Sequence, residues 1–308
     1  MQGVVYKSTG SWYLVKEKDG KAWKARVKGK LRIDGDISST NPIAVGDNII
    51  FDVDDELEGT GTIREINERH NYMIRVSPHN KNQKHIIASN LDLALVIATI
   101  ASPRTSQGFI DRFLLTAEAY HIPAAVVFNK ADVLKEKHKL QLAEWTKMYQ
   151  DAGYKVYSMV ALDPASVRPL MADLEGRTTL FSGHSGVGKS TLINQLIPDI
   201  ALRTQEVSDY SGKGQHTTTF AEMFDLPFGG RIIDTPGVKE FGLIDLKREE
   251  LAHYFPEMKK RLNDCRFNNC LHLNEPGCAV KEAVASGDLH GDRYLSYLSI
   301  MDTIERKW

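Results

Sequence analysis

The residue pattern best suited to chemistry is a glycine-rich loop that could hold phosphate groups. Residues 183–190 read GHSGVGKS and fit the pattern G-x-x-x-x-G-K-[ST]. In such a loop, backbone N–H groups surround phosphate oxygens, and the following helix adds its positive dipole end. Lys189 could stabilise the charge on a transferring phosphoryl group, a catalytic role, and the Ser190 hydroxyl could ligate Mg²⁺. The residues expected to contact the phosphates are Gly183, His184, Ser185, Gly186, Val187, Gly188, Lys189, Ser190 and Thr191.

The sequence on either side of this loop supports that interpretation. Residues 179–181 predict a short strand, and residues 190–197 predict a helix. Strand, loop and helix in this order are the context in which a phosphate-binding loop works. A glycine-rich turn that matches the pattern by chance does not account for this context.

A second motif could select the base of a nucleotide. Asn129-Lys130-Ala131-Asp132 reads N-K-x-D and directly follows the predicted strand 124–128. The Asp132 carboxylate accepts hydrogen bonds, so it suits the ring N–H and the exocyclic amine of guanine. Adenine offers no such pair of donors, and a site built for both donors leaves polar groups unpaired with the wrong base. Alone, the motif could be a strand-end turn, but beside a phosphate loop it favours GTP over ATP.

Three more segments could complete the nucleotide site. In Asp234-Thr-Pro-Gly237, which matches D-x-x-G, Asp234 could hold Mg²⁺ through water and the Gly237 amide could contact the γ-phosphate. Residues 212–219 carry hydroxyl groups able to complete the Mg²⁺ shell, without indicating whether Thr217, Thr218 or Thr219 does so. Ser158 follows the next predicted strand, where a second loop contacting base or ribose is expected.

These motifs occur in an unusual order. From residue 91 onward, apolar strands alternate with amphipathic helices, which predicts a doubly wound α/β domain. The base-selecting motif precedes the phosphate loop, whereas in ordinary GTPases the phosphate loop comes first. A circular permutation, which keeps the sheet and moves the chain ends, explains the order.

The N-terminal region has a different rhythm and a marked charge pattern. Five short alternating runs within residues 1–68 predict a small β-barrel of the OB type. Within the polar stretch 67–90, residues 77–84 predict a loop or linker. Residues 1–32 carry nine basic residues against Glu17 and Asp19. Lysines beside Trp12, Tyr13 and Trp23 suit a nucleic-acid surface. The alternative for the aromatic rings is that they fill the barrel interior. The alternative for the charged side chains is that they lie on ordinary solvated faces of strands.

The three cysteines of the chain lie together near its C-terminal end. Three thiolates and one imidazole form a closed tetrahedral set for Zn²⁺, and such a site is structural. Three unliganded thiols are the alternative, and the histidine argues against an iron–sulfur cluster. The predicted Zn²⁺ ligands are Cys265, Cys270, His272 and Cys278. On either side of them, residues 246–262 and 293–304 predict helices.

Composition sets the remaining limits. The 308 residues are 42% hydrophobic and 26% charged, values typical of a soluble globular protein. The start lacks the pattern of a secretory signal, and the apolar run 93–101 is too short to span a bilayer. We therefore expect a cytoplasmic protein that does not contact a membrane.

Taken together, the chain resembles the circularly permuted, ribosome-associated GTPases of the RsgA/YjeQ family. The similarity covers nearly the whole chain: residues 1–70 as an OB-fold RNA-binding domain, 71–242 as the permuted P-loop GTPase domain, and 243–308 as a helical zinc domain. It implies a GTPase that hydrolyses GTP to GDP and phosphate, with Mg²⁺ and one structural Zn²⁺. It also implies stimulation by the small ribosomal subunit, contact with its ribosomal RNA and a role in its late maturation. We expect a monomer, with other assembly factors as further candidate partners.

Three positions bear on the mechanism that the resemblance implies. Val238 follows Gly237 where many GTPases place a water-orienting glutamine, so intrinsic hydrolysis should be slow. We hypothesise that His216 approaches the attacking water when the subunit binds; a backbone-bonding loop residue is the alternative. Gln215 stands where the family usually has arginine. Two rival functions are a GTP-gated RNA-binding scaffold and a signalling GTPase with a protein effector.

Overall fold

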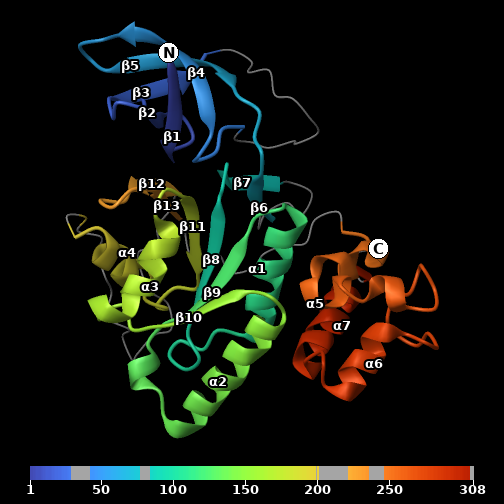
Figure 1. Ribbon diagram of the computed structural model, residues 1–308. Coiled ribbons are helices and arrows are strands. Elements are labelled where there is room, and N and C mark those ends of the chain that lie inside the picture. Colours follow the sequence, from blue (N-terminus) through green and yellow to red (C-terminus); the bar gives the residue numbers. More distant parts are fainter. Residues whose placement is uncertain (29–41, 77–83, 199, 201–220, 236–245, 306–308) are drawn as a thin grey trace.

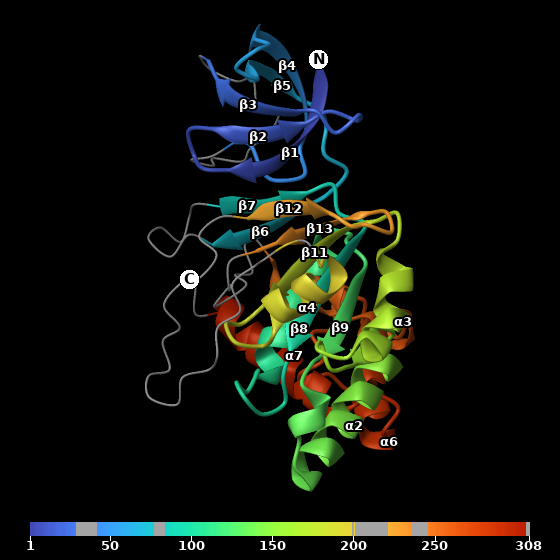
Figure 2. The same cartoon turned by 90° about the vertical axis from the view of Figure 1, so that its left-hand side faces the viewer.

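The computed structural model describes residues 1–28, 42–76, 84–198, 200, 221–235 and 246–305 of the protein. A small barrel lies at one end, an α/β layer structure follows it, and a helical unit lies beside that structure (Figures 1 and 2). Within these described residues, no helix is both long and apolar enough to cross a membrane.

The N-terminal barrel is built from five strands, as the sequence predicts. Antiparallel pairing of β1 with β4 closes the ring, and β3 pairs with β5 in parallel. Alternate side chains such as Val5, Val15, Phe51 and Ile63 point inward and are buried, which explains the period-two pattern of the sequence. The strands are β1 (Gln2–Ser8), β2 (Tyr13–Lys16), β3 (Ala22–Val27), β4 (Asn48–Asp55) and β5 (Thr60–Ile66).

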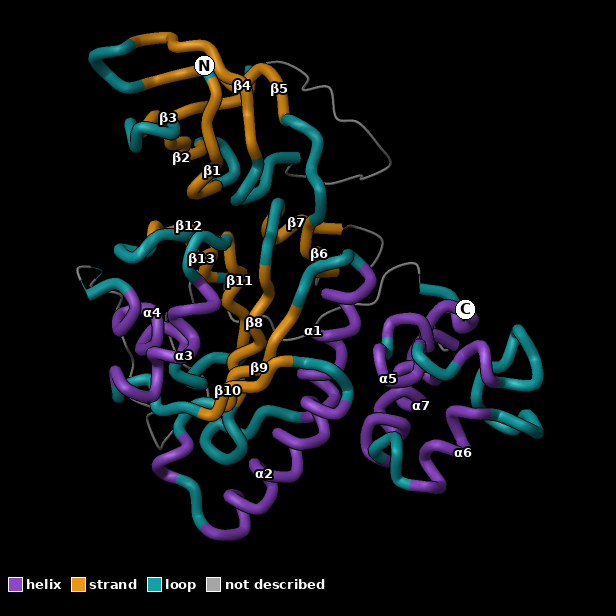
Figure 3. The backbone as a smooth tube through the Cα atoms, in the orientation of Figure 1, coloured by secondary structure: helices purple, strands orange, loops and turns teal. Residues whose placement is uncertain are grey.

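A mostly parallel sheet forms the centre of the molecule (Figure 3). Its strand order is β10-β9-β8-β11-β13-β12, and only β12, at the end of this series, runs antiparallel to its neighbour. The fully buried strand β8 explains the continuous apolar run of the sequence. The strands are β8 (Leu93–Ala98), β9 (Ala124–Phe128), β10 (Lys155–Ser158), β11 (Thr178–Gly183), β12 (Glu222–Asp225) and β13 (Arg231–Asp234).

Four helices cover the two faces of this sheet. Helices α1 and α2 pack on one face through residues such as Phe113 and Trp145, and α3 and α4 pack on the other through Leu170 and Leu192. Helix α1 begins after Ser106, whose hydroxyl accepts a hydrogen bond from the Phe109 amide at 3.3 Å. The helices are α1 (Gln107–Ala119), α2 (Glu136–Asp151), α3 (Pro164–Leu174) and α4 (Lys189–Leu196).

The polar stretch 67–90, within which residues 77–84 are predicted as a loop or linker, contains a β-hairpin. Strands β6 (Tyr72–Val76) and β7 (Lys84–Ser89) pair antiparallel. Met73 and Ala88 lie opposite each other and join the core beside α1, so the hairpin has a buried face that the polar composition concealed. The two strands were not expected from the sequence, because a few buried positions suffice for a two-stranded element packed on a larger core. Residues 77–83 of the predicted loop lie outside the described residues.

The barrel is joined to the central sheet through a strand pair. Strand β1 pairs with β12 at Lys7 and Glu222, whose charged groups are 2.8 Å apart. The Tyr6 hydroxyl and the Lys16 ammonium both donate to Asp225 of β12, at 2.5 and 2.8 Å. One eleven-stranded sheet therefore runs through both units.

The C-terminal unit is helical and packs beside α1 (Figure 1). The continuous helix predicted over 246–262 is broken, because Pro256 cannot donate a backbone hydrogen bond and starts a new element. The helix predicted over 293–304 is confirmed as part of α7. The elements are η2 (Arg248–Tyr254), α5 (Pro256–Lys259), η3 (Leu262–Asp264), α6 (Ala279–Ser286) and α7 (Gly291–Glu305).

Candidate functional site

The phosphate loop lies between β11 and α4, as the sequence predicts. Gly186 and Gly188 have φ angles of 83° and 92°, which favour glycine. A Cβ atom at Gly188 would also lie 2.3 Å from the Asn129 amide nitrogen. The loop therefore needs glycine at position 188 both for its backbone angle and for the close approach of Asn129. The backbone N–H groups of such a loop, ahead of a helix N-terminus, suit phosphate binding.

Lys189 is buried at the start of α4 and makes two polar contacts. Its ammonium donates to the Asp234 carboxylate and to the Thr235 carbonyl oxygen. Asp234 ends β13, which pairs with β11 so that Asp234 lies beside Phe181. The predicted phosphate-binding lysine and the predicted magnesium ligand are thus brought together from positions 45 residues apart.

Asn129 connects three loops that meet at one edge of the sheet. Its amide nitrogen donates to the Val187 carbonyl at 2.9 Å, and its amide oxygen accepts from the Ala161 N–H at 2.9 Å. Both atoms of this buried side chain are therefore used for protein contacts. Asn129 thus holds the base-selecting loop against the phosphate loop and against the loop after β10.

In the rest of the N-K-x-D motif, Lys130 and Ala131 are half-buried and Asp132 is exposed. Lys130 has a left-handed backbone conformation, with φ of 62°, and donates to the Ser102 carbonyl at 3.1 Å. Partial burial lowers its pKa, and Asp132 opposes that shift. Asp132 lies in the short 3-10 turn η1 (Ala131–Val133) with its carboxylate exposed. An exposed acceptor at this loop is available to an incoming base.

Ser158 is the predicted nucleotide contact with the least support from the geometry. It ends strand β10 and is exposed. The contacts to the base-selecting loop come instead from Met159, whose carbonyl accepts from the Ala131 N–H, and from Ala161. The sequence offered no signal for these residues, because they act through backbone atoms.

Several predicted site residues lie outside the residues that the structure describes. They are Gly237, the hypothesised His216, the candidate magnesium ligands Thr217, Thr218 and Thr219, and the positions Gln215 and Val238. Their assignments remain predictions from the sequence.

His184, although part of the phosphate loop, contacts α1, which covers the opposite face of the sheet from α4. Its ring centroid lies 3.8 Å from that of Phe109 in α1, and the two planes are inclined by 33°. Burial lowers the pKa of His184, so the imidazole is neutral at pH 7. This contact could not be predicted from the sequence, because the two residues are 75 positions apart.

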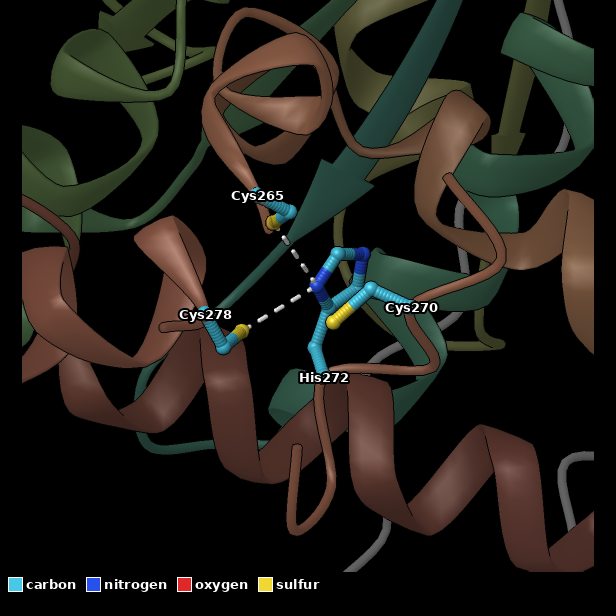
Figure 4. A group of neighbouring side chains, drawn as sticks. All are labelled: Cys265, Cys270, His272 and Cys278. Carbon is cyan, nitrogen blue, oxygen red and sulfur yellow. Dashed lines mark hydrogen bonds between the residues drawn. The ribbon is translucent and has the colours of Figure 1, made fainter. Parts of the chain in front are cut away.

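The four predicted metal ligands converge in the C-terminal unit (Figure 4). The ligand atoms of Cys265, Cys270, His272 and Cys278 all lie within 4.8 Å of one another. His272 Nδ1 is 3.7 Å from the Cys265 sulfur and 3.3 Å from the Cys278 sulfur. In a tetrahedral zinc site these N···S separations are about 3.6 Å, given the usual Zn–N and Zn–S bond lengths. The arrangement therefore fits a zinc ion bound through Nδ1.

The chemistry of the cluster also favours a bound cation. Burial, together with the neighbouring Cys278 and Cys265, raises the pKa of the Cys270 thiol to about 12. Thiolates at such close range repel one another unless a positive charge lies between them. A zinc ion would supply that charge and hold all three sulfurs deprotonated.

The three aromatic residues singled out near the basic N-terminus divide into two kinds. Tyr13 and Trp23 are buried in the barrel core, as the alternative interpretation held. Trp12 instead lies half-buried at the surface, with the Lys24 ammonium 4.9 Å and the Arg26 guanidinium 5.5 Å from its ring. An aromatic face flanked by cations suits a nucleic-acid base and its phosphate.

Comparisons with known proteins agree with these features. Residues 66–244 match the family model described as RsgA GTPase, and residues 2–61 match that described as RsgA N-terminal domain. Two curated relatives, from Christiangramia forsetii and Bacteroides fragilis, are both named small ribosomal subunit biogenesis GTPase RsgA. The first is 50% identical over 303 residues, covering 98% of this chain and 96% of the relative. The second is 48% identical over 305 residues, covering 99% and 97%.

Two solved structures share the fold over almost the full chain. The crystal structure of YjeQ from Thermotoga maritima aligns with a TM-score of 0.77 and 30% identity, covering 98% of this chain and 97% of that one. The structure of YloQ, described as a circularly permuted GTPase, aligns with a TM-score of 0.75 and 28% identity, covering 100% and 96%. The permuted order of the motifs is therefore shared with known structures.

Proposed function

This chain belongs to the RsgA family of GTPases, and on that premise we propose that it hydrolyses GTP to GDP and phosphate in the biogenesis of the small ribosomal subunit. The observation that carries the proposal is the junction made by Asn129. It binds the base-selecting loop directly to the phosphate loop, so the base and the phosphates of one nucleotide fit a single site. The domains proposed for this activity are 1–70, 71–242 and 243–308.

The residues proposed to bind GTP act at its two ends. Asp132 accepts from the two guanine donors, while the backbone N–H groups of residues 183–191 and the Lys189 ammonium bind the phosphates. To do so, Lys189 exchanges its contact with Asp234 for the nucleotide. Ser190 and Asp234 would hold Mg²⁺ through the hydroxyl and carboxylate oxygens that this ion prefers, and the ion would supply positive charge next to the phosphates. Gly237 is proposed to donate its amide to the γ-phosphate.

We propose that hydrolysis depends on the ribosomal subunit. A valine at position 238 cannot orient a water molecule, so the isolated protein lacks that function at this position. His216 is proposed to supply it once the subunit has bound. The barrel and the C-terminal zinc unit are the proposed contacts to ribosomal RNA, and maturation of the subunit is the proposed step.

The test of this function is steady-state GTP hydrolysis with and without purified small subunits. We expect slow hydrolysis alone and at least a tenfold higher kcat with small subunits, with little effect of large subunits. His216→Ala should lose most of the stimulation and keep GDP affinity, while His138→Ala on α2 serves as the matched control. Equal rates with and without subunits would favour a GTP-gated scaffold. No retention on RNA would favour a signalling GTPase.

A second prediction concerns the surface formed by Trp12, Lys24 and Arg26. Trp12→Ala should weaken binding of a single-stranded RNA by about 1–3 kcal/mol, because one stacking platform is lost. Lys24→Ala and Arg26→Ala should each remove one phosphate contact. Each should therefore lower the steepness of log K for RNA binding against log salt concentration by about 0.7. Fluorescence anisotropy at several salt concentrations measures both, with Lys147→Ala on α2 as the control. Unchanged affinity in Trp12→Ala would exclude stacking at this ring.

A further inference from the structure

Helix α1 lies between the phosphate loop and the C-terminal unit (Figure 1). Its first turn carries Phe109, whose ring contacts His184 of the phosphate loop at a centroid distance of 3.8 Å. Farther along, Leu115 of the same helix is buried in the hydrophobic core of the C-terminal unit. One rigid element therefore contacts both the candidate nucleotide site and the candidate metal domain.

Between these two contacts, α1 carries a buried carboxylate. Asp111 is 1% exposed and lies two residues after Phe109. Its carboxylate accepts from the Arg293 guanidinium of α7 at 2.5 Å, from the Tyr149 hydroxyl of α2 at 3.0 Å and from the Gln107 amide at 3.2 Å. Asp111 is thus held by two other helices, α7 and α2, and by Gln107 of its own helix.

Arg293 joins the α/β domain to the C-terminal unit through two nitrogen atoms of its guanidinium group. Nη1 donates to Asp111, and Nε donates to Glu257 of α5 at 2.7 Å. The side chain is 2% exposed and lies 4.7 Å from the Phe255 ring centre. Burial opposes its charge, but Asp111 and Glu257 raise the pKa of Arg293 well above its ordinary value. Separating Arg293 from either carboxylate would leave its charge buried and poorly paired, which is strongly unfavourable. Movement of α7 should therefore be accompanied by movement of α1.

The same helix α7 also holds the metal-binding loop. The Tyr294 hydroxyl donates to the His272 carbonyl at 2.6 Å, and the Tyr297 hydroxyl donates to the Leu271 carbonyl at 2.8 Å. These residues lie within four positions of Arg293 on one helix. Displacement of the metal loop would therefore be transmitted to the buried ion pairs.

We propose that Arg293 is a positioning residue that couples the Cys265–Cys278 metal cluster to the phosphate loop through α1. The contacts run from the Leu271–His272 backbone through α7 and Arg293 to Asp111, and from Phe109 to His184. The inference rests on the nucleotide and zinc binding proposed above. Since coupling between two binding sites is reciprocal, zinc must change GDP affinity by the same factor by which GDP changes zinc affinity.

The experiment measures that factor with the full chain and without ribosomes. The zinc dissociation constant is determined by competition with a metal-binding indicator, with and without saturating Mg²⁺ and GDP. The GDP dissociation constant is determined by fluorescence for the zinc-loaded and the zinc-free protein. We expect each constant to change by about fivefold or more, and the two factors to agree.

Two variants interrupt the proposed connection at different points. Phe109→Leu removes the ring contact with His184 and leaves all the buried charges in place. The combined variant Asp111→Asn, Glu257→Gln, Arg293→Gln removes the charges and keeps similar side-chain volumes. The matched control is Arg112→Ala, which removes a 3.3 Å hydrogen bond between α1 and Thr303 of α7 without touching Asp111 or Phe109. Circular dichroism establishes that each protein is folded.

In both interrupting variants, zinc should change the GDP dissociation constant by a factor close to one, and GDP should change the zinc constant as little. Arg112→Ala should keep the wild-type factor. A factor near one in the wild type, or an undiminished factor in Phe109→Leu, would overturn the coupling. If the combined variant does not fold, Phe109→Leu decides the matter alone. Failure of GDP to bind the wild type at all would refute the proposed nucleotide site, whereas bound GDP without an effect on zinc would refute only the coupling.

Discussion

Asp132→Asn is expected to change the preferred nucleotide from GTP to xanthosine triphosphate. The carboxylate offers acceptors to both guanine donors, whereas asparagine offers one acceptor and one donor. Xanthine presents a ring N–H and a carbonyl oxygen at the same positions, which match asparagine. With guanine, one charge-assisted hydrogen bond, worth about 1.5–3 kcal/mol, is lost and the other becomes a weaker neutral one. The guanine amine also faces the asparagine NH₂, so GTP affinity should fall about a hundredfold.

Competition binding with GDP and xanthosine diphosphate measures this change. The Asn129 contacts that hold the loop are untouched, so the variant should remain folded and bind the matched nucleotide. Asp151→Asn, an exposed acid on α2, is the control and should keep the wild-type preference. Unchanged preference for GDP in Asp132→Asn would move base selection to another residue.

Removal of zinc is expected to destabilise the C-terminal unit strongly. In small structural sites the apparent binding free energy of zinc is about 10–16 kcal/mol, and much of it is folding free energy. Cys278→Ser removes a buried zinc ligand directly before α6. The metal loop that it helps to hold is also hydrogen-bonded to Tyr294 of α7, so loss of zinc should loosen both helices. A loss of only ~4 kcal/mol corresponds to a melting temperature lower by about 10 °C.

Zinc content and differential scanning calorimetry test this expectation together. The purified wild type should contain one zinc per chain, and Cys278→Ser or treatment with a strong chelator should lower both zinc content and melting temperature. Ser286→Ala, which removes a hydroxyl from α6 without touching the cluster, should resemble the wild type. Zinc-free protein with an unaltered melting temperature would show that the cluster does not stabilise the fold.

Features that depend on short stretches of chain could be predicted from the sequence. The phosphate loop needs glycines at fixed spacing ahead of a helix, the N-K-x-D motif lies within four residues, and the metal ligands lie within fourteen. Strand periodicity likewise predicted the five strands of the barrel and the buried strand β8. The five-stranded barrel, the family and its GTPase function are confirmed, whereas the individual nucleotide contacts remain predictions.

Features that depend on contacts between distant segments could not be predicted. Composition alone could not separate Trp23, inside the barrel, from Trp12 at its surface, because both stand among lysines. The polar stretch 67–90 concealed a hairpin, since its few apolar residues are buried by a core built elsewhere.

The sequence by itself determined which chemical groups the protein has and the order in which they occur. Only the tertiary structure decided how those groups are connected. Asn129 belongs to a motif that suggests base selection, yet its side chain is used to join loops. Arg293 matches no motif, yet it is the buried cation between two domains because Asp111, 182 residues away, lies opposite it. Hydrogen bonds and buried charges of this kind are fixed by packing, which places distant residues together without a trace in the local pattern.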